Sequence, residues 1–402
     1  MQQDTYLKAG LPADAIDGAE MLAHTLSWAA INSGTDNLAG LAAMADALAG
    51  AFSALPGEVT LEEPAPVTAI SPEGAEVVRE HGRHLVLRVR PDAARRFLLT
   101  GHMDTVYPVD HPFQQVRWID AETLNGPGTA DMKGGIAVIL AALTAFETCP
   151  EARAVGYDVM INSDEETGSL SSAPLIARLA RGKYAALTYE PSARPEGTFA
   201  HARGGSGNFS LTVTGRSAHA GRNPQDGRNA VVAAAALALG LKALETADIP
   251  INPARIDGGS GNNVVPDNAV LRFNLRPKTH EASHAFSHNL NVLIEQIVLK
   301  YEVGIEIHGG ITRAPKPVDA KAARLFELVE ACSSQLGQHF ALQDSGGVCD
   351  GNNIAACGVP VVDTMGARGG AIHSPDEFLI VSSLAERAAL SALVLHRLSG
   401  GN

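Results

Sequence analysis

Three consecutive acids, Asp164, Glu165 and Glu166, follow an apolar β-type segment at 157–161 and precede a Thr-Gly-Ser turn. Adjacent like charges repel one another, so a fold keeps them at a strand end where something neutralises them. A multivalent cation would do so. The alternative is a solvated acidic loop that caps the next helix, because acids are common near helix N-termini. The acidic segment alone leaves both interpretations open.

Further reactive side chains follow other expected strands. Buried strands of open α/β sheets usually present such side chains just past their C-terminal ends, so these groups are expected to lie along one edge of a sheet. In chain order they are His102 and Asp104 after the strand at 97–100, Glu190 after 184–189, and His373 after 359–363.

His102 and Asp104 are two residues apart, so on an extended chain they share a face. A metal-bound imidazole usually donates its other N–H to a carboxylate or a carbonyl. Asp104 is therefore either a ligand itself or the partner that orients His102. A histidine and an aspartate at this spacing are a weak signal by themselves.

Asp131 lies in the glycine-rich segment GPGTADMKGG at 126–135, immediately before an apolar helix expected at 136–146. Its simplest role is to cap that helix. A phosphate-binding loop is a further alternative, but the segment matches neither GxxxxGK[ST] nor GxGxxG. Its position among the other acids and histidines makes Asp131 a candidate metal ligand.

Two imidazoles and three carboxylates form a normal ligand set for two divalent ions, with one carboxylate bridging and one glutamate left over. Mixed nitrogen and oxygen ligands favour zinc, with cobalt or manganese possible. Paired metals activate a shared water and polarise a carbonyl, and a free glutamate can take the proton. The candidates are His102, Asp131, Glu165, Glu166, Glu190 and His373.

A chain of 402 residues suits two domains. Between 208 and 310 the expected strands and helices follow the order β-α-β-β-α-β of a ferredoxin-like domain. The helix at 318–336 and the strand at 359–363 then resume the earlier pattern. We therefore expect an α/β catalytic domain formed by 1–198 and 315–402, with 199–314 inserted as a second domain.

The net charge of −13 and the lack of a Lys/Arg run argue against nucleic acid or an anionic membrane as the main partner. The apolar run at 230–241 is too short to span a membrane. Residues 1–10 show no signal peptide, so a cytoplasmic protein is expected, although a processed exported form stays open. The four cysteines show no CxxC spacing and are interpreted as reduced thiols.

Seven motifs, in this order, resemble the dinuclear zinc aminoacylase and carboxypeptidase family: GHMDTV, GTADMKGG, NSDEETGS, YEP, GRSAHAG, NNVVPD and AIHSPDE. The family includes bacterial glutamate carboxypeptidase, acetylornithine deacetylase and succinyl-diaminopimelate desuccinylase. The resemblance covers nearly the whole chain. It implies a mixed-sheet zinc-peptidase catalytic domain, an inserted dimerisation domain and a homodimer.

The resemblance also implies how the ligands divide between two zinc ions. Asp131 would bridge the metals. Glu166 and His373 would complete one site, and His102 and Glu190 the other. The peptide bond that follows Asp131 is expected to be cis.

Further residues receive roles from the same resemblance. Glu165 would be the general base, and Asp104 would orient His102. His219, in the GRSAHAG loop, would reach from the inserted domain into the active site of the other subunit and help to hold the oxyanion. Asn263 and Arg276 would bind substrate, since an arginine can hold a free carboxylate with two hydrogen bonds.

The expected activity is hydrolysis of the amide bond to an amino acid with a free carboxylate, in a small peptide, as in the glutamate carboxypeptidases. Deacylation of N-acyl amino acids uses the same chemistry and stays open. Two competing interpretations are a catalytically silent binding protein of the same fold and a phosphate-binding enzyme. The amidohydrolase subgroup has a cysteine among its ligands, and Asp131 at that position argues against it.

Overall fold

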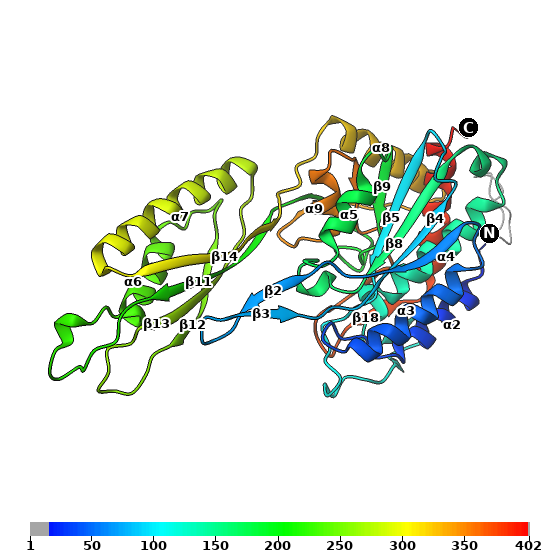
Figure 1. Ribbon diagram of the computed structural model, residues 1–402. Coiled ribbons are helices and arrows are strands. Elements are labelled where there is room, and N and C mark those ends of the chain that lie inside the picture. Colours follow the sequence, from blue (N-terminus) through cyan, green and yellow to red (C-terminus); the bar gives the residue numbers. More distant parts are fainter. Residues whose placement is uncertain (1–15, 401–402) are drawn as a thin grey trace.

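The computed structural model describes residues 16–400 and consists of a larger and a smaller domain (Figure 1). A six-stranded sheet forms the centre of the larger domain. Four neighbouring strands pair in parallel, and the two strands at one edge are joined by antiparallel pairings, which confirms the expected mixed α/β class. The strand order is β1 (Glu58–Glu62), β4 (His84–Val89), β8 (Gly156–Asn162), β5 (Arg96–His102), β9 (Ala185–Thr188) and β16 (Val361–Val362).

Helices cover both faces of this sheet. Successive side chains of a strand point to opposite faces, and here both faces are apolar. In β4, Leu85 and Leu87 belong to the main core, whereas Val86 packs on the opposite side. The main core receives α2 (Gly18–Ala29), α3 (Leu38–Phe52), α4 (Gly134–Glu147), α8 (Ala320–Gln335) and α10 (Ser382–Leu398). The opposite face packs against α5 (Ala173–Ala180) and α9 (Asp350–Ala356).

A four-stranded antiparallel sheet with two helices forms the smaller domain, which has its own apolar core. Its strand order, β12-β13-β11-β14, is that of a ferredoxin-like fold. In chain order the elements are β11 (Ser206–Thr214), α6 (Ala230–Ala243), β12 (Ile251–Gly258), β13 (Asn268–Leu275), α7 (His280–Tyr301) and β14 (Gly304–Arg313).

Two expected elements are shorter than the sequence indicated. Hydrophobic spacing predicts that the first helix of the smaller domain starts at Asp226, but α6 begins at Ala230, because Pro224–Asp226 form a 3-10 turn and the Asn229 side chain accepts from Val232 N. The core strand expected at 359–363 pairs with β9 only over Val361–Val362. Both differences lie at element ends, where local pattern is least informative.

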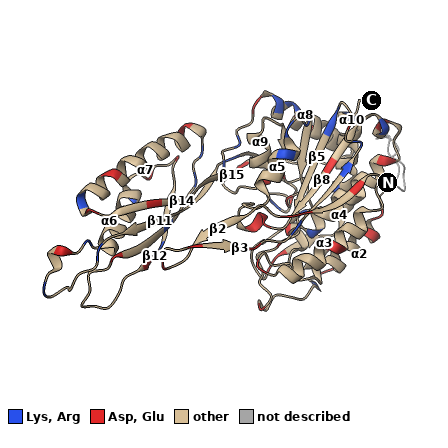
Figure 2. Ribbon diagram, in the orientation of Figure 1, with Lys and Arg blue, Asp and Glu red and all other residues tan. Residues whose placement is uncertain are grey.

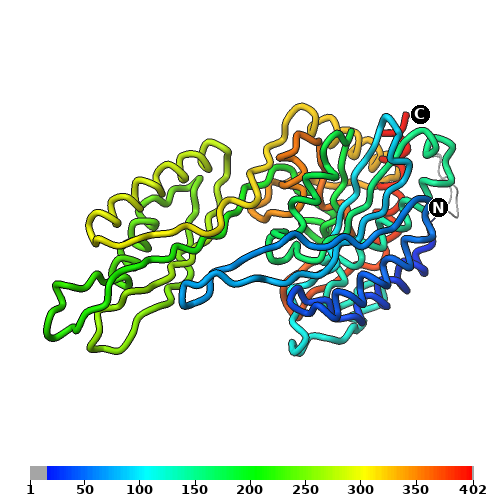
Figure 3. The backbone as a smooth tube through the Cα atoms, viewed as in Figure 1, coloured from blue at the N-terminus to red at the C-terminus, as the bar shows by residue number. Residues whose placement is uncertain are grey.

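The chain crosses between the domains twice, and Figure 3 shows the two crossing segments. Before the first crossing, β10 (Phe199–Arg203) pairs with β15 (Leu342–Ser345), and Phe199 lies in the main core. Arg203 and Lys316 exchange backbone hydrogen bonds of 3.0 and 2.8 Å, which join the two crossings. The inserted domain therefore leaves the larger domain next to the place where it returns.

An unexpected hairpin, β2 (Val67–Ile70) and β3 (Glu76–Arg79), extends from the larger domain to the smaller one (Figure 1). Thr68 Oγ1 lies 3.3 Å from His308 Nε2, and Arg272 donates to Ile70 O at 2.7 Å. The local pattern of this hairpin is two β-type segments on either side of Ser-Pro-Glu-Gly at 71–74. Figure 2 shows acidic residues on both domains.

A small sheet closes the larger domain near the loops of Asp131 and His373. Its order is β17 (Gly369–Gly370), β18 (Phe378–Ile380), β7 (Thr123–Asn125) and β6 (Arg117–Trp118). One described stretch, Thr129–Glu147, has the length and hydropathy of a membrane span, but 89% of its apolar window is buried inside the protein. Core helices meet the same test, so this is weak evidence for a membrane. Residues 1–10, where no signal peptide is expected, lie outside the described range.

Candidate dinuclear metal site

The parallel strands bring the candidate ligands to one edge of the sheet. In the β5–β8 register His102 lies opposite Asn162, and in the β5–β9 register Thr100 lies opposite Thr188. β5 and β8 therefore end at the same level, and β9 ends two residues earlier. The residues that follow them, Glu165–Glu166 and Glu190, must lie near His102 for this reason.

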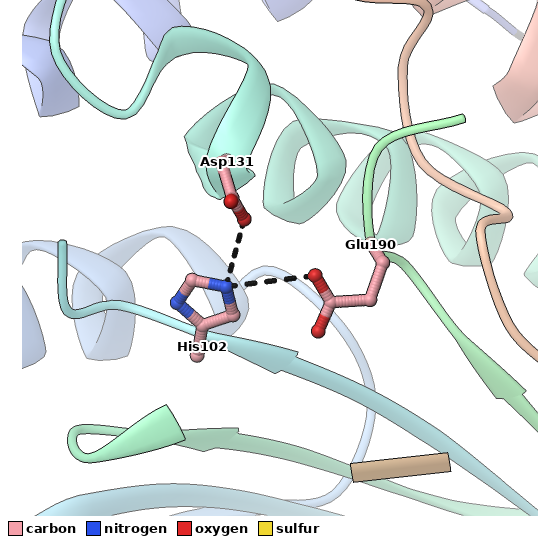
Figure 4. A group of neighbouring side chains, drawn as sticks. All are labelled: His102, Asp131 and Glu190. Atoms are coloured by element: carbon pink, nitrogen blue, oxygen red, sulfur yellow. Dashed lines mark hydrogen bonds and ion pairs between the residues drawn. The ribbon is translucent and has the colours of Figure 1, made fainter. Parts of the chain in front are cut away.

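His102 is fully buried and its two ring nitrogens have different partners. Nδ1 lies 3.0 Å from Asp104 O, so it is the N–H that donates to this carbonyl. In the neutral ring Nε2 carries the lone pair that could ligate a metal, and this nitrogen lies 3.1 Å from Asp131 Oδ1 and 3.8 Å from Glu190 Oε2. Figure 4 shows both carboxylates pointing toward this nitrogen.

Asp131 directs its two oxygens toward different histidines. Oδ1 faces His102, while Oδ2 lies 3.3 Å from His373 Nε2. Glu166 Oε2 is 3.1 Å from the same His373 nitrogen. Two groups of possible ligand atoms result, each lying within 4.8 Å and both containing Asp131. The Asp131–Met132 peptide bond is cis, as the resemblance implied.

Asp104 contacts His102 more closely through its backbone oxygen than through its carboxylate. Its carboxylate Oδ1 lies 3.4 Å from His102 Nδ1, farther than its own backbone oxygen. The two carboxylate oxygens instead accept hydrogen bonds of 3.1 Å from the backbone N–H groups of Glu165 and Glu166. Thr35 Oγ1 also donates to Oδ2 at 2.8 Å. Asp104 therefore orients His102 through its carbonyl and the acidic segment through its side chain.

The buried carboxylates of the two ligand groups perturb one another's pKa values and those of the histidines. Burial and the Asp131 carboxylate raise the pKa of Glu166 to about 8. Asp131 and Glu166 raise the pKa of His373 to about 11. Glu190 Oε1 is buried and has no hydrogen-bond partner among the described residues. Two histidines and three carboxylates with an orphaned oxygen fit two divalent ions, because metal coordination would satisfy this oxygen and neutralise the acids.

Glu165 stands apart from the ligand groups. Its Oε1 lies 2.7 Å from Arg313 Nη2, and both side chains are buried. Burial raises the pKa of Glu165 to about 7, although the Arg313 charge opposes this. A carboxylate held beside a metal site without ligating it suits proton transfer near neutral pH. Asp164, the remaining acid of the segment, accepts a hydrogen bond from Ser171 N at 2.7 Å and so stabilises the turn that follows.

Two arginines at the site were not predicted from the sequence. Arg313 ends a strand 148 residues after Glu165. A strand that ends in an arginine carries no local sign of a contact with a residue so far away in the sequence. Arg203 donates from Nε to Asp363 Oδ2 at 2.8 Å and lines the cavity beside the ligands.

The residues expected to bind substrate, Arg276 and Asn263, and the expected catalytic residue His219 fall into two separate groups. Arg276 lies at the junction end of β13, where burial and the Arg313 charge lower its pKa. His219 and Asn263 lie in exposed loops at the other end of the smaller domain, where Ala220 N donates to Asn263 O at 2.8 Å. β11 separates these ends by nine residues, or about 30 Å. His219 and Asn263 are therefore remote from the ligands of their own chain.

A cavity of about 470 Å³ opens beside the ligands. Its volume is in the range of small-molecule sites, and its walls are acidic, basic and apolar. Besides the ligands Asp131, Glu166, Glu190 and His373, its lining includes Glu165, Arg203, Ser345, Cys349, Thr364 and Phe378.

The fold and the two ligand groups are those of a two-domain, metal-dependent hydrolase. The chain belongs to peptidase family M20/M25/M40, whose family model matches residues 98–397. It is thus a hydrolytic enzyme that acts on amide bonds, in a family that depends on metal.

Named relatives share the sequence at a moderate level. Carboxypeptidase G2 of Pseudomonas sp. (strain RS-16) is 27% identical over 330 residues, covering 80% of this chain and 78% of the relative. Succinyl-diaminopimelate desuccinylase of Halorhodospira halophila is 29% identical, covering 75% and 83%. The aminopeptidase PepT structure from Bacillus cereus superposes with a TM-score of 0.71 at 21% identity, covering 96% and 99%. This last likeness concerns the fold.

Proposed function

We propose that the protein hydrolyses the amide bond between an acyl group and an amino acid with a free carboxylate, in a small peptide of the glutamate carboxypeptidase type. The observation that carries this proposal is the arrangement of Asp131 between His102 and His373, with Glu165 held close by and unligated. The similarity to carboxypeptidase G2 supports the substrate class. Two zinc ions, or cobalt or manganese, would occupy the two ligand groups.

Bound metals would polarise the substrate carbonyl and lower the pKa of a water molecule. Glu165 would take the proton of that water on a carboxylate oxygen and pass it to the leaving amine. Asp104 keeps Glu165 in place through the backbone N–H of that residue. Arg276, which has no ion pair among residues 16–400, would bind the carboxylate of the substrate.

His219 would act in the active site of a second subunit. Gly221 N donates to His219 Nδ1 at 3.1 Å, so the proton of a neutral ring resides on Nε2. The exposed Nε2–H is then a donor for an oxyanion. Because His219 is remote from its own chain's ligands, this role requires a homodimer.

Exposed apolar residues on the smaller domain support dimerisation there. Val232 and Leu239 lie seven residues apart on α6, with exposed fractions of 48% and 75%, and so share a helix face. On α7, Val292 and Leu299 repeat the spacing. Apolar side chains left on one face of a domain are typical of an interaction surface.

Deacylation of N-acyl amino acids is the second candidate, favoured by the similarity to succinyl-diaminopimelate desuccinylases. A panel of dipeptides and N-acyl amino acids, assayed after chelation and reloading with zinc or cobalt, tests both. Cleavage that requires a free C-terminal carboxylate and follows the C-terminal side chain supports the carboxypeptidase. Turnover governed by the acyl group supports the deacylase, and no turnover of any compound with either metal contradicts both.

A further inference from the structure

Glu377 has a buried carboxylate that collects four hydrogen bonds, and only 1% of the residue is exposed. Its Oε1 accepts from the backbone N–H groups of Ala130 at 3.0 Å and Asp131 at 3.1 Å. Its Oε2 accepts from Gly128 N at 3.1 Å and from the Tyr107 hydroxyl at 2.9 Å. Every donor is neutral, and three of them belong to the loop that carries Asp131.

An ion pair does not account for this buried charge. Within residues 16–400, Glu377 has no Lys, Arg or His nitrogen within 4 Å. Lys133, on the same loop, directs its Nζ to Ile31 O at 2.8 Å. Burying a carboxylate without a cation is costly, so the four donors are the interactions that compensate for it.

The loop before Asp131 is shaped to receive an anion. Gly128 adopts φ 69°, and a Cβ there would lie 2.7 Å from Thr105 Cγ2, so only glycine fits. A left-handed residue in such a turn directs successive N–H groups to one side and forms a concave anion site. The Glu377 carboxylate fills that concavity from within the protein.

The same residue connects this loop to the segment that carries His373. Glu377 N donates to Ser374 O at 3.1 Å. The single hydroxyl proton of Tyr107 is shared between that carbonyl, at 2.8 Å, and Glu377 Oε2, at 2.9 Å. Asn125 Nδ2 donates to Glu377 O at 2.7 Å. The bridging ligand and one terminal ligand are thus held in fixed relation through one side chain and its backbone.

We propose that Glu377 is a positioning residue of the metal centre. It fixes the peptide unit of Asp131 so that the two carboxylate oxygens face His102 and His373, and it ligates no metal itself. The role rests on the proposed dinuclear site. A residue that only stabilises the fold would affect the metal-free protein most, whereas a positioning residue affects metal binding more than folding.

The test is Glu377→Gln, which keeps the size of the side chain and one acceptor oxygen but removes the charge. We expect about 10- to 100-fold weaker binding of zinc and cobalt in chelator competition. The absorption spectrum of the cobalt-loaded protein should also change, because it reports ligand geometry. The melting temperature of the metal-free protein should stay within a few degrees of the parent value.

Asp158→Asn is the matched control, because Asp158 is also a buried acid but pairs with Lys183 away from the site. It should lower the melting temperature and leave metal affinity unchanged. Parental metal affinity and cobalt spectrum in Glu377→Gln would overturn the role, and so would a loss of affinity no larger than that of the control.

A second variant tests the same role if Glu377→Gln does not fold. Tyr107→Phe removes one of the four donors and should weaken metal binding in the same direction, by a smaller factor. Parental affinity in this variant then overturns the role. A parent protein that binds no zinc or cobalt contradicts the proposed metal site itself, which distinguishes that failure from failure of the Glu377 role alone.

Discussion

Arg313 Nη2 lies 2.7 Å from Glu165 Oε1 and joins the two domains at the active site. Arg313 is the last residue of β14, the strand by which the chain leaves the smaller domain. It also donates to Glu165 O at 3.1 Å and to Ser169 Oγ at 2.7 Å. The proposed base is therefore held by a residue whose position depends on how the smaller domain is docked.

Replacing Arg313 with methionine should destabilise the metal-free protein by about 3–5 kcal/mol, because it leaves the buried Glu165 and Asp350 carboxylates without their cation. Urea unfolding measures this. Arg79→Met is the control, since its pair with Asp36 is largely exposed and should cost less than about 1 kcal/mol. Equal losses in the two variants would show that the Arg313 pair contributes no more than a surface pair.

Alanine replacements of the neighbouring acids Glu165 and Glu166 should have different effects on metal content and turnover. Glu166→Ala removes a ligand on the His373 side and should lower the metal content per chain. Glu165→Ala should keep the metal content near the parental value and lose several orders of magnitude in kcat, because the proton acceptor is gone. Metal analysis and turnover on the same samples check both. Parental turnover in Glu165→Ala excludes the base.

Asp350 should make the stability of the metal-free protein depend on pH. Burial raises its pKa to about 6, against an ordinary value of 3.8. The folded state therefore holds a proton that the unfolded chain has released between these values, and its stability falls as the pH rises from about 4 to 6. The difference corresponds to about 3 kcal/mol.

Asp350→Asn removes this titration, so its unfolding free energy should change less than that of the parent between pH 4 and 7. Urea unfolding at several pH values, with chelator present, measures the difference. A parallel pH dependence in the two proteins would refute the assignment. Asp350 accepts hydrogen bonds from Ser169 and Asn162, so a constant offset between the two curves is expected.

Subunit complementation should test the role of His219. Alone, His219→Ala and Glu165→Ala should both be nearly inactive. A mixed dimer has one active site with Glu165 from one chain and His219 from the other. Random reassociation of equal amounts should therefore restore about a quarter of the parental activity, because half the dimers are mixed and each has one complete site. No recovery despite proven subunit exchange would contradict action across the dimer.

Asn352 should control the junction between the domains. Its Nδ2 donates to Gly204 O at 2.9 Å and to Ala314 O at 2.8 Å, so one amide holds both crossings. Asn352→Ala leaves two carbonyls without that donor and should cost about 1–3 kcal/mol, with faster proteolysis at the crossings. The adjacent Asn353→Ala is the control, since the Asn353 side-chain oxygen has no partner among the described residues. Equal proteolysis of the two variants would contradict the role.

The larger part of the candidate site could be derived from the sequence because its signals are local. His102, Glu165, Glu166 and Glu190 each follow a short apolar strand within a few residues, and Asp131 lies in a glycine-rich turn. Strands that end together bring such residues together. The βαββαβ order of the smaller domain could also be predicted, since each helix or strand shows its own hydrophobic periodicity.

Other relationships depended on the tertiary structure. Which oxygen of Asp131 faces which histidine, and the capping of the acidic segment by the Asp104 carboxylate, follow from side-chain placement. Arg313 reaches Glu165 only because two domains dock, and Glu377 meets the Asp131 loop from 246 residues away. Local sequence pattern specifies where the chain forms strands, helices and turns. It does not specify contacts between distant segments, which packing decides.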